Sequence, residues 1–558
     1  PHTIAQLLHN RKITDINDVE KFLNPSWSDN HDPFLLKNME KSIARFYAAI
    51  QNNEHITIYA DYDADGVPGS IVLSDLLKKI KYTHYDIYIP HRHHEGYGIH
   101  TAALEKIKKS GTTLIVSIDV GITEHAAAQW CAKNNIDLII TDHHTPLKKS
   151  DGSQDLPEPF ALINPKQETC NYPDAMLCGC GVIFKFVQAF IQRHGDEYNI
   201  HAGWEKWLLD MVGISTISDM VPLQNENRIF AYFGLKVMQE VARAQNKRIG
   251  LKKMMWDAGI NSRHMTETDI AFGITPKINA ASRMSHPMDA VAVFNATNDI
   301  DATTSMKHLV ALNNERKKLT KKMTAEAIAM LSEREIGNVI IVGQDDWQAG
   351  ILGLVASKLV EKYRVPVFTW SREGDVILGS ARSLDGLHLV EIMQLAPKKS
   401  FIGFGGHAEA GGYRCNPDEI EKLQKRLETA VKKFTQENTN RKKDTIHIDM
   451  ELSADDVNTQ TYTDMRKLAP FGIGNPEPLF IIKNVFIDSA NEFGKEKNHL
   501  ELSFKNSLGI SIRAIKFFST VSDFEKLIPG QTCDIIGHLE YSVFMGRHEL
   551  RMKLVDVL

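Results

Sequence analysis

Short strand-like runs alternate with helical segments in the first quarter of the chain, and this alternation limits the possible folds most strongly. The runs HITIYA and TTLIVSI are rich in β-branched residues and too short for helices, which favours buried strands. Parallel strands must be joined by crossover segments, so strands separated by helices predict βαβ units and a parallel sheet. The expected strands are 55–60, 84–90, 112–118 and 136–141, and the expected helices are 69–81, 101–110 and 123–134.

Acidic residues directly follow three of these strands. In an open parallel sheet, functional groups gather beyond the carboxyl ends of the strands, so the three clusters are expected to meet at one edge. Carboxylates packed there repel one another unless a cation neutralises them. The clusters are Asp61, Asp63 and Asp65 after the first strand, Asp119 after the third, and Asp142, His143 and His144 after the fourth.

These clusters predict a centre for two divalent metal ions. A lone Asp-x-Asp is usually a surface turn and a lone His-His pair is usually part of a loop, but three clusters at one sheet edge favour a shared site. Mostly carboxylate ligands with imidazole suit Mn²⁺ or Mg²⁺ better than structural zinc. Two such ions about 3.5–4 Å apart can activate a water and steady the leaving oxygen of a phosphodiester. Gly66 permits a tight turn into the next helix.

The remainder of the chain predicts three further regions. Residues 180–332 are mostly helical in pattern, and 303–332 contain no Gly or Pro, which is typical of one long helix. A polar stretch, 435–445, is expected to be a linker. Short strands with turn signals over 446–558 predict a small β-barrel, for which an OB-fold is the natural candidate. Between these parts lies a second α/β region, with strands at 338–343, 365–370 and 376–381 and helices at 349–363 and 417–434.

Composition narrows the function classes. A chain of 558 residues is too long for one core, and a net charge of −5 argues against a uniformly basic nucleic-acid coat but allows a local basic groove. Six cysteines are too few for a disulfide framework; a metal site among Cys170, Cys178 and Cys180 is possible, but close packing of reduced thiols is favoured. The sequence lacks an apolar span and a signal-peptide core, so a cytoplasmic location is expected.

The acidic motifs resemble those of the DHH phosphoesterase family. Asp142-His143-His144 is its naming motif, DYDADG resembles the first motif, Asp119 in SIDVGI the second, and Asp219 in TISDMVPLQNENR the fourth. The resemblance continues in order along nearly the whole chain, through ITPKINAASRM, LNNERKK, DDWQAGILGLVASKLVEKY, GSARS, GFGGHAEAGG and APFGIGNPEPLF.

The resemblance implies an α/β fold class, in which a parallel-sheet DHH catalytic domain is joined by a long helix to a smaller α/β DHH-associated domain, followed by a C-terminal OB-like β-barrel. The expected regions are a helical cap at 1–45, the catalytic domain at 46–300, the connecting helix at 301–332, the DHH-associated substrate-binding domain at 333–437 and the OB-like nucleic-acid-binding domain at 438–558.

The resemblance also implies roles for the motif residues. Asp61, Asp63 and Asp119 would hold one metal ion, while Asp65, Asp119, His143 and Asp219 would hold the other, with Asp119 bridging. How the three acids of the first motif divide between the two ions stays open. Asp142 would orient the histidine pair. Catalysis would rest on Asp119, on Asp142 and on His144, which would contact the scissile phosphate or assist the leaving group.

Substrate contacts are implied on the same basis. Arg283 would grip a backbone phosphate, and Ser380 and Arg382 would bind a terminal 5′ phosphate, since arginine reads phosphate through paired donors. His407 would face the substrate, with a helix-capping role as the alternative. Arg92 and Tyr97 belong to a loop near the active site, where the tyrosine could stack on a base.

Two further features bear on nucleic acid. Residues 315–322, ERKKLTKK, place five cations on the connecting helix, either beside a DNA strand or on a solvated face. Phe471, Phe480 and Phe493 are expected in the barrel core more than on a stacking surface. The chain departs from the family pattern at Gln348, Ser282, Ala381 and residues 67–70, and because none of these is a proposed metal ligand, an active enzyme is expected.

The function implied by the resemblance is a single-stranded-DNA-specific 5′ to 3′ exonuclease. It would release 5′ mononucleotides by two-metal hydrolysis with Mn²⁺ or Mg²⁺, in DNA repair and recombination. The implied partners are single-stranded DNA, a RecQ-type helicase and a single-strand-binding protein, and the chain is expected to be a monomer. Alternatives are a phosphodiesterase of short oligoribonucleotides or cyclic dinucleotides, whose known forms lack the region 446–558, and an inactive DNA-binding scaffold, which typically loses the metal acids.

Overall fold

The computed structural model describes residues 2–244, 247–438, 446–524, 526–544 and 547–558. A five-stranded parallel sheet, with strand order β2-β1-β3-β4-β7, forms the core of the first domain. The four strands expected from the sequence are confirmed; β7, with three residues, was not expected. The strands are β1 (His55–Ala60), β2 (Tyr85–Tyr88), β3 (Thr112–Ile118), β4 (Asp137–Thr141) and β7 (Ala161–Ile163).

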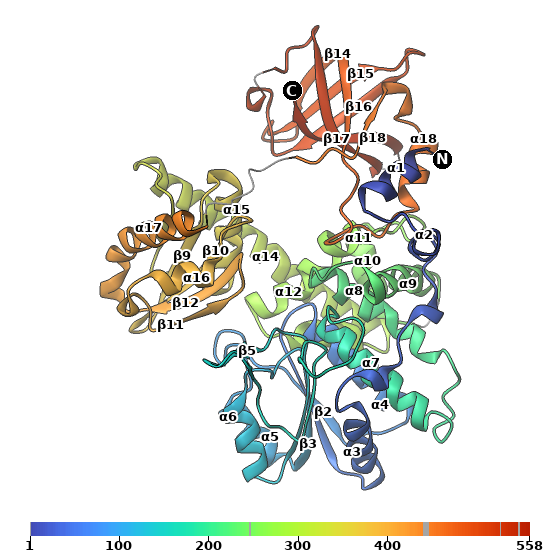
Figure 1. Ribbon diagram of the computed structural model, residues 1–558, viewed down its shortest axis with the longest axis vertical. Helices are drawn as coiled ribbons and strands as arrows, with labels where there is room; N and C mark the ends of the chain where they lie inside the picture. Colours follow the sequence, from blue (N-terminus) through green and yellow to red (C-terminus); the bar gives the residue numbers. More distant parts are fainter. Residues whose placement is uncertain (1, 245–246, 439–445, 525, 545–546) are drawn as a thin grey trace.

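Helices cover both faces of this sheet, as a parallel sheet requires (Figure 1). One face packs against α5 (Thr101–Lys109) and α6 (His125–Lys133), and a small hairpin, β5 (Leu147–Lys148) and β6 (Gln154–Asp155), follows β4. The other face packs against α3 (Met39–Gln51), α4 (Gly66–Lys79) and α7 (Gly179–His194). Two apolar layers therefore hold the strand ends in fixed positions.

A helical region follows and ends in one long helix. The connecting helix expected at 303–332 is confirmed as α14 (Asp299–Ser332), whose N-cap Asn298 accepts a hydrogen bond from the backbone N–H of Asp301. At about 1.5 Å per residue it spans about 50 Å and carries the chain to the next domain. Before it come α8 (Leu209–Ser218), α9 (Asn225–Arg243), α10 (Ile249–Asp257), α11 (Glu267–Asp269), a π-helical turn η4 (Ile270–Ile274), α12 (Thr275–Met284) and α13 (Met288–Asn295).

The second α/β domain is a mixed sheet with strand order β11-β12-β10-β9-β8. The expected linker at 435–445 begins inside a helix, since α17 continues to Glu437, and 439–445 lie outside the described residues. The strands are β8 (Ile340–Gly343), β9 (Val367–Glu373), β10 (Val376–Arg382), β11 (Gly403–Gly406) and β12 (Ala410–Cys415), and the helices are α15 (Leu352–Tyr363), α16 (Leu389–Leu395) and α17 (Ile420–Glu437).

The C-terminal domain is a closed barrel, which confirms the predicted OB-like fold. Strand β14 pairs with both β15 and β17, and β16 pairs with β18 to complete the circuit. Phe471 and Phe480 lie in its core, as expected. The elements are β13 (Met450–Leu452), α18 (Thr459–Arg466), β14 (Phe480–Phe493), β15 (His499–Lys505), β16 (Ser511–Phe517), β17 (Thr532–Phe544) and β18 (Arg547–Val557).

The N-terminal segment joins the first domain to the last. Apolar residues of α1 (His2–Asn10) are part of the barrel core, and α2 (Ile16–Leu23) packs beside them. The next helix, α3, belongs to the core of the parallel sheet instead. The boundary expected at residue 45 therefore falls inside α3, because local helical pattern does not reveal which distant core a helix joins.

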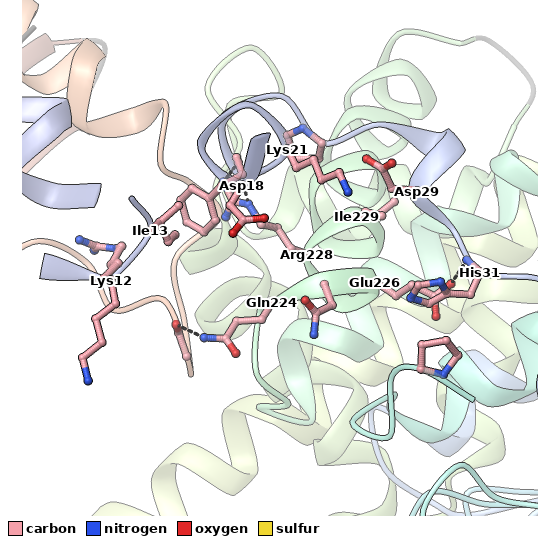
Figure 2. Close-up of a pocket in the computed structure, with 16 residues that line it drawn as sticks. Lys12, Ile13, Asp18, Lys21, Asp29, His31, Gln224, Glu226, Arg228 and Ile229 are labelled. Atoms are coloured by element: carbon pink, nitrogen blue, oxygen red, sulfur yellow. Dashed lines mark hydrogen bonds between the residues drawn. The ribbon is translucent and has the colours of Figure 1, made fainter. Parts of the chain in front are cut away.

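Polar contacts, most of them partly buried, hold the barrel against the helical region. Arg228 of α9 donates to the carbonyls of Phe22 and Ala469. Gln224, which Figure 2 shows near Arg228, donates to the carbonyl of Gly474. Arg466 of α18 forms a paired ion bridge with Glu267 of α11. Guanidinium groups that satisfy several buried acceptors fix orientation as well as distance. No helix in the described part of the chain is long and apolar enough to cross a membrane.

Candidate metal centre and phosphate pocket

The acidic clusters meet at the carboxyl edge of the parallel sheet. The backbone N–H of Asp61 bonds to the end of β3, and that of Asp119 to the end of β4, so the strand ladders continue up to these residues. Asp119 has a left-handed backbone, with φ of 63°, a conformation that aspartate tolerates better than most residues. A Cβ at Gly179 would lie 2.5 Å from the Cβ of Asp119, so α7 can start this close to the centre only with glycine.

The structure brings all the expected metal ligands together in three overlapping groups, which share Asp119 and His143. The Nε2 atom of His143 lies 3.2 Å from Asp119 Oδ1 and 3.6 Å from Asp219 Oδ2. The potential ligand atoms in each group lie within 4.8 Å of one another. The groups are Asp61, Asp63 and Asp119; Asp65, His143 and Asp219; and Asp119, His143 and His144.

Unsatisfied buried atoms show that this centre fits cations. Four buried atoms have no hydrogen-bond partner among the described residues: one oxygen of Asp61, one oxygen of Asp119 and both ring nitrogens of His143. Burial, followed by repulsion from neighbouring carboxylates, raises the pKa of Asp61 and of Asp119 well above the usual range. Burial lowers the pKa of His143 to about 4, so its neutral ring keeps a lone pair for a metal. Oxygen-rich ligands with one imidazole suit Mn²⁺ or Mg²⁺.

Asp65 differs from the other acids of its motif. The backbone N–H groups of Gly179 and Cys180, at the N-terminus of α7, donate to its two oxygens at 2.6 and 2.7 Å, and the hydroxyl of Ser215 donates as well. These bonds use much of the acceptor capacity of the carboxylate and favour an anchoring role for Asp65. Its Oδ2 atom nevertheless lies 3.7 Å from His143 Nε2.

Asp142 and His144 form a buried pair beside the metal ligands. Asp142 accepts a 2.8 Å hydrogen bond from His144 Nδ1 and further bonds from the backbone N–H groups of Ile122 and His143. Burial alone would raise the pKa of Asp142, but these donors outweigh it and lower that pKa to about 2. Burial likewise would lower the pKa of His144, yet the Asp142 contact raises it to about 9. The contact with Asp142 therefore favours a protonated His144 ring, which can donate to a phosphate oxygen.

Arginine side chains gather next to the metal centre without acidic partners. In the described part of the chain, Arg92, Arg283, Arg316 and Arg382 form no ion pair with a carboxylate, and Arg283 donates to the carbonyl of Gly350 at 2.8 Å. Burial, then the charges of Arg92, Arg382 and Arg316, lowers the pKa of Arg283 to about 9. Such a group of cations is suited to a phosphate. Arg316, within the basic run of α14, was not singled out from the sequence.

Ser380 and Arg382 lie together at the start of α15. Arg382 donates to Ser380 Oγ at 3.2 Å. A Cβ at Gly353 would come within 2.8 Å of Arg382 Nη2 and 3.0 Å of Ser380 Oγ, so glycine keeps this space open. A helix N-terminus adds positive potential. Together these features form a pocket suited to an anionic group.

Two aromatic residues and a histidine border the centre. Tyr97 is 44% exposed and lies edge-on to Tyr62, over which the guanidinium of Arg92 stacks at 4.7 Å. His407 lies in the turn between β11 and β12 rather than at a helix start, so the capping alternative is wrong. Its ring is nearly parallel to that of His144, with centroids 6.3 Å apart. Tyr62 lies within the DYDADG motif, but the sequence assigned no role to it.

None of the positions that depart from the family pattern belongs to the potential metal-binding groups. Gln348 donates to the carbonyl of Arg283 at 3.3 Å, and Ser282 and Ala381 are fully buried. On α14 the lysines of 317–322 are exposed, and Lys321 pairs with Glu496 of the barrel.

Metal addition is expected to stabilise the protein more at about pH 8 than at about pH 5.5. Burial and the charges of Asp65 and Asp63 raise the pKa of Asp219 to about 9 in the folded protein, against about 3.9 in an unfolded chain. The stability linked to this proton is complete below about pH 4 and is lost as pH rises through 9, and a bound cation replaces the proton. Thermal unfolding with and without Mn²⁺ at both pH values checks this. The prediction is contradicted if Mn²⁺ raises the unfolding temperature equally at both pH values. It is also contradicted if the stabilisation by Mn²⁺ has the same pH dependence in Asp219→Asn.

Three family models match the chain: the DHH family N-terminal domain at 55–216, the DHHA1 domain at 317–433 and the RecJ OB domain at 448–556. Among curated proteins, the chain is 31% identical over 559 residues to the single-stranded-DNA-specific exonuclease RecJ of Bacillus subtilis, covering 99% of this chain and 67% of that protein. It is 30% identical to RecJ of Escherichia coli, covering 86% and 83%.

Solved structures show the same fold. RecJ from Thermus thermophilus in complex with Mn²⁺ matches with a TM-score of 0.81 and 22% identity, covering 100% of this chain and 76% of that chain. An exonuclease RecJ bound to manganese matches with a TM-score of 0.60 and 26% identity, covering 71% and 95%. With the same three domains in the same order, and at least 30% identity over most of two relatives, this chain belongs to the RecJ family of DHH phosphoesterases.

Proposed function

We propose that this protein is a metal-dependent exonuclease that digests single-stranded DNA from the 5′ end and releases 5′ mononucleotides. The observation that carries this proposal is the pocket of Ser380 and Arg382. The charge of Arg92 affects the pKa of Arg382 as well as those of Asp61 and Asp63, so this pocket adjoins the acidic centre. The pocket suits a terminal 5′ phosphate, and holding that phosphate would place the first phosphodiester at the metal ligands. The named activity of the relatives supports the same substrate.

The chemistry follows from the placement of the side chains. Two Mn²⁺ or Mg²⁺ ions would supply an activated water and neutralise phosphate charge. The residues that would hold them are Asp61, Asp63, Asp119, His143 and Asp219, and Asp65 lies in the group with His143 and Asp219. Water attacks the phosphorus, and the bond to the 3′ oxygen of the first nucleotide breaks. His144, held by Asp142, donates a hydrogen bond to the phosphate or a proton to the departing 3′ oxygen. The shortened strand keeps a 5′ phosphate for the next cycle.

The surrounding domains suit a single strand. The OB-like barrel and the exposed lysines of α14 provide a platform and positive charge, and Tyr97 is exposed for base stacking. We extend the proposal to a role in DNA repair and recombination, a cytoplasmic location, a monomeric state, and partnership with a RecQ-type helicase and a single-strand-binding protein. The domain divisions given above, with the N-terminal helices assigned to the barrel, are part of the same proposal.

End-labelled DNA tests this function. With Mn²⁺, a single strand labelled at its 5′ end should release labelled mononucleotide at once, whereas a 3′ label should appear in mononucleotide only late. Blunt duplex should resist digestion. Hydrolysis of very short RNA or of cyclic dinucleotides without cleavage of DNA would move the assignment to that branch of the family. Binding of DNA with no cleavage at all would indicate a scaffold.

Replacing Arg382 by alanine is expected to lower kcat/KM for 5′-phosphorylated DNA by about 10-fold to 100-fold, the usual loss for a hydrogen bond to a charged group. The same change should leave cleavage of 5′-hydroxyl DNA nearly unaffected, because that substrate lacks the terminal phosphate. Arg372→Ala is a matched control, since Arg372 lies on the neighbouring strand, paired with Asp345. Equal losses on both substrates would show that Arg382 does not read the terminal phosphate.

A further inference from the structure

A fourth strand end reaches the catalytic edge, and it carries a lysine. The short strand β7 runs parallel to β4 and ends at residue 163, so Asn164-Pro165-Lys166 leave the sheet at the same edge as the acidic clusters. Three residues give too little periodicity for β7 to be detected in the sequence. Lys166 therefore lay outside the motifs that the sequence pattern revealed.

Hydrogen bonds fix the backbone of this lysine next to the DHH motif. The side chain of Asn164 is fully buried and donates to the carbonyl of His144 at 2.9 Å. Its oxygen accepts from the backbone N–H of Lys166 at 2.8 Å, and Gln154 donates to the carbonyl of Lys166 at 2.8 Å. Lys166 is thus held at a set position relative to His144, unlike a lysine on a free loop.

The ammonium group of Lys166 has no hydrogen-bond or ion-pair partner in the part of the chain that the structure describes. It is partly buried, yet among the residues that the structure describes it forms no hydrogen bond and no ion pair within 4 Å. Burial lowers the pKa of Lys166, and the charges of Asp219 and Asp142 partly offset this effect. A lysine with a purely structural role would be paired when buried, and a solvated one would be exposed like Lys148. Lys166 fits neither description.

The strand order places Lys166 on the far side of the metal centre from the arginines. In the order β2-β1-β3-β4-β7, Arg92 follows the first strand and Lys166 the last, with the acidic clusters between them. Neighbouring strands lie about 4.8 Å apart, so the two ends are separated by about 19 Å. The charge of Arg92 lowers the pKa of Arg283 and of Arg382. The charge of Lys166 instead lowers the pKa of three residues at the other end: Asp219, His143 and His407. Two separate cationic sites therefore flank the metal ligands.

We propose that Lys166 binds the phosphate that follows the cleaved bond, between the second and third nucleotides of the substrate. This inference rests on the proposed function, in which the terminal 5′ phosphate occupies the arginine side and the first phosphodiester lies at the metal ligands. A strand continuing past that centre next meets the β7 end of the sheet. Lys166 lies there, half-buried and without a partner among the described residues. Lys166 is thus a positioning residue that holds the strand behind the scissile bond.

Substrate length provides a direct test. A 5′-phosphorylated dinucleotide contains one phosphodiester, the scissile one, and has nothing for Lys166 to bind. A 5′-phosphorylated trinucleotide contains the following phosphate as well. Loss of Lys166 should therefore penalise the trinucleotide and spare the dinucleotide, a pattern that general damage to the site would not produce.

The experiment measures kcat/KM of wild type, Lys166→Ala and Lys166→Arg with Mn²⁺ on both oligonucleotides, and on a trinucleotide whose second linkage is an uncharged methylphosphonate. We expect Lys166→Ala to lower trinucleotide cleavage by about 10-fold or more, with arginine restoring much of it. The wild type should cleave the methylphosphonate trinucleotide more slowly than the ordinary trinucleotide, by the same factor. Lys166→Ala should cleave the two trinucleotides equally fast. Lys148→Ala, an exposed lysine of the adjacent hairpin, is the matched control.

Two results would overturn the inference. An equal loss on dinucleotide and trinucleotide would place Lys166 at the scissile phosphate or in the framework of the site, and unchanged cleavage of both would remove it from substrate binding. Thermal unfolding of each variant identifies a folding defect. If the wild type itself cleaves neither oligonucleotide nor longer single-stranded DNA, the proposed function fails instead, and the two failures are distinguishable.

Discussion

Replacing Asp119 by asparagine is expected to abolish hydrolysis of single-stranded DNA, with kcat lower by about 10⁴-fold or more. Asp119 belongs both to the group with Asp61 and Asp63 and to the group with His143 and His144, so its loss removes a ligand from both halves of the centre. Each metal ion contributes several kcal/mol of transition-state stabilisation, and about 1.4 kcal/mol corresponds to tenfold in rate. Single-turnover digestion of 5′-labelled DNA at saturating Mn²⁺ measures the effect.

Metal binding distinguishes this loss from misfolding. Asp119→Asn should keep its thermal stability without metal, because it removes one of several mutually repelling carboxylates, and it should lose most of the Mn²⁺-induced stabilisation. Asp86→Asn is a matched control, since Asp86 lies in the same sheet beside His55, away from the catalytic edge. Activity within about tenfold of wild type, with unchanged Mn²⁺ affinity, would show that Asp119 is not the shared ligand.

The metal centre could be predicted from the sequence because its parts are local and repetitive. Each acidic cluster directly follows a strand that its composition identifies clearly. Because the carboxyl ends of parallel strands lie at one edge of the sheet, the clusters are predicted to be close together in space. Asp61, Asp119 and His143 meet for this reason, although 82 residues separate the first from the last. The long helix was predictable in the same way, since 303–332 contain no residue that breaks a helix.

Features that depend on distant packing could not be predicted. Helix α1 has an ordinary amphipathic pattern, and nothing in it indicates that its apolar residues complete the core of a barrel more than 440 residues later. Arg316 is one of several cations on α14, and only the fold shows that it is partly buried and that its charge lowers the pKa of Arg283. Lys166 was missed because its strand is too short to give a pattern.

Asp65 shows where motif spacing is ambiguous. Alternate residues of Asp-x-Asp-x-Asp point to one side of an extended segment, so spacing alone makes Asp61, Asp63 and Asp65 equivalent. The chain instead turns into α4 at Gly66, where a Cβ would lie 2.3 Å from the carbonyl oxygen of Asp61. This turn directs Asp65 toward the N-terminus of α7, while Asp61 keeps an oxygen without a hydrogen-bond partner.

Replacing Asp65 by alanine is therefore expected to destabilise the fold by about 3 kcal/mol or more, even in the presence of a metal chelator. The change leaves the buried N–H groups of Gly179 and Cys180 without an acceptor, at a cost of about 1–3 kcal/mol each. Asp61→Ala in the metal-free protein should cost little or even stabilise, because it removes a buried carboxylate whose pKa is raised by burial and by Asp63. Urea unfolding with chelator measures both free energies.

The two variants should respond to metal in opposite ways. Asp61→Ala should lose most of the stabilisation by Mn²⁺, because it removes an oxygen that has no other partner, whereas Asp65→Ala should keep much of it once folded at low temperature. If Asp65→Ala instead unfolds like the wild type in chelator and loses Mn²⁺ affinity, Asp65 is a ligand of the second ion and α7 needs no such anchor. The comparison thus distinguishes Asp65, which positions α7, from the acids that hold the metal. The basis for this distinction is the hydrogen bond that Asp65 accepts from Gly179, which lies 114 residues later in the sequence.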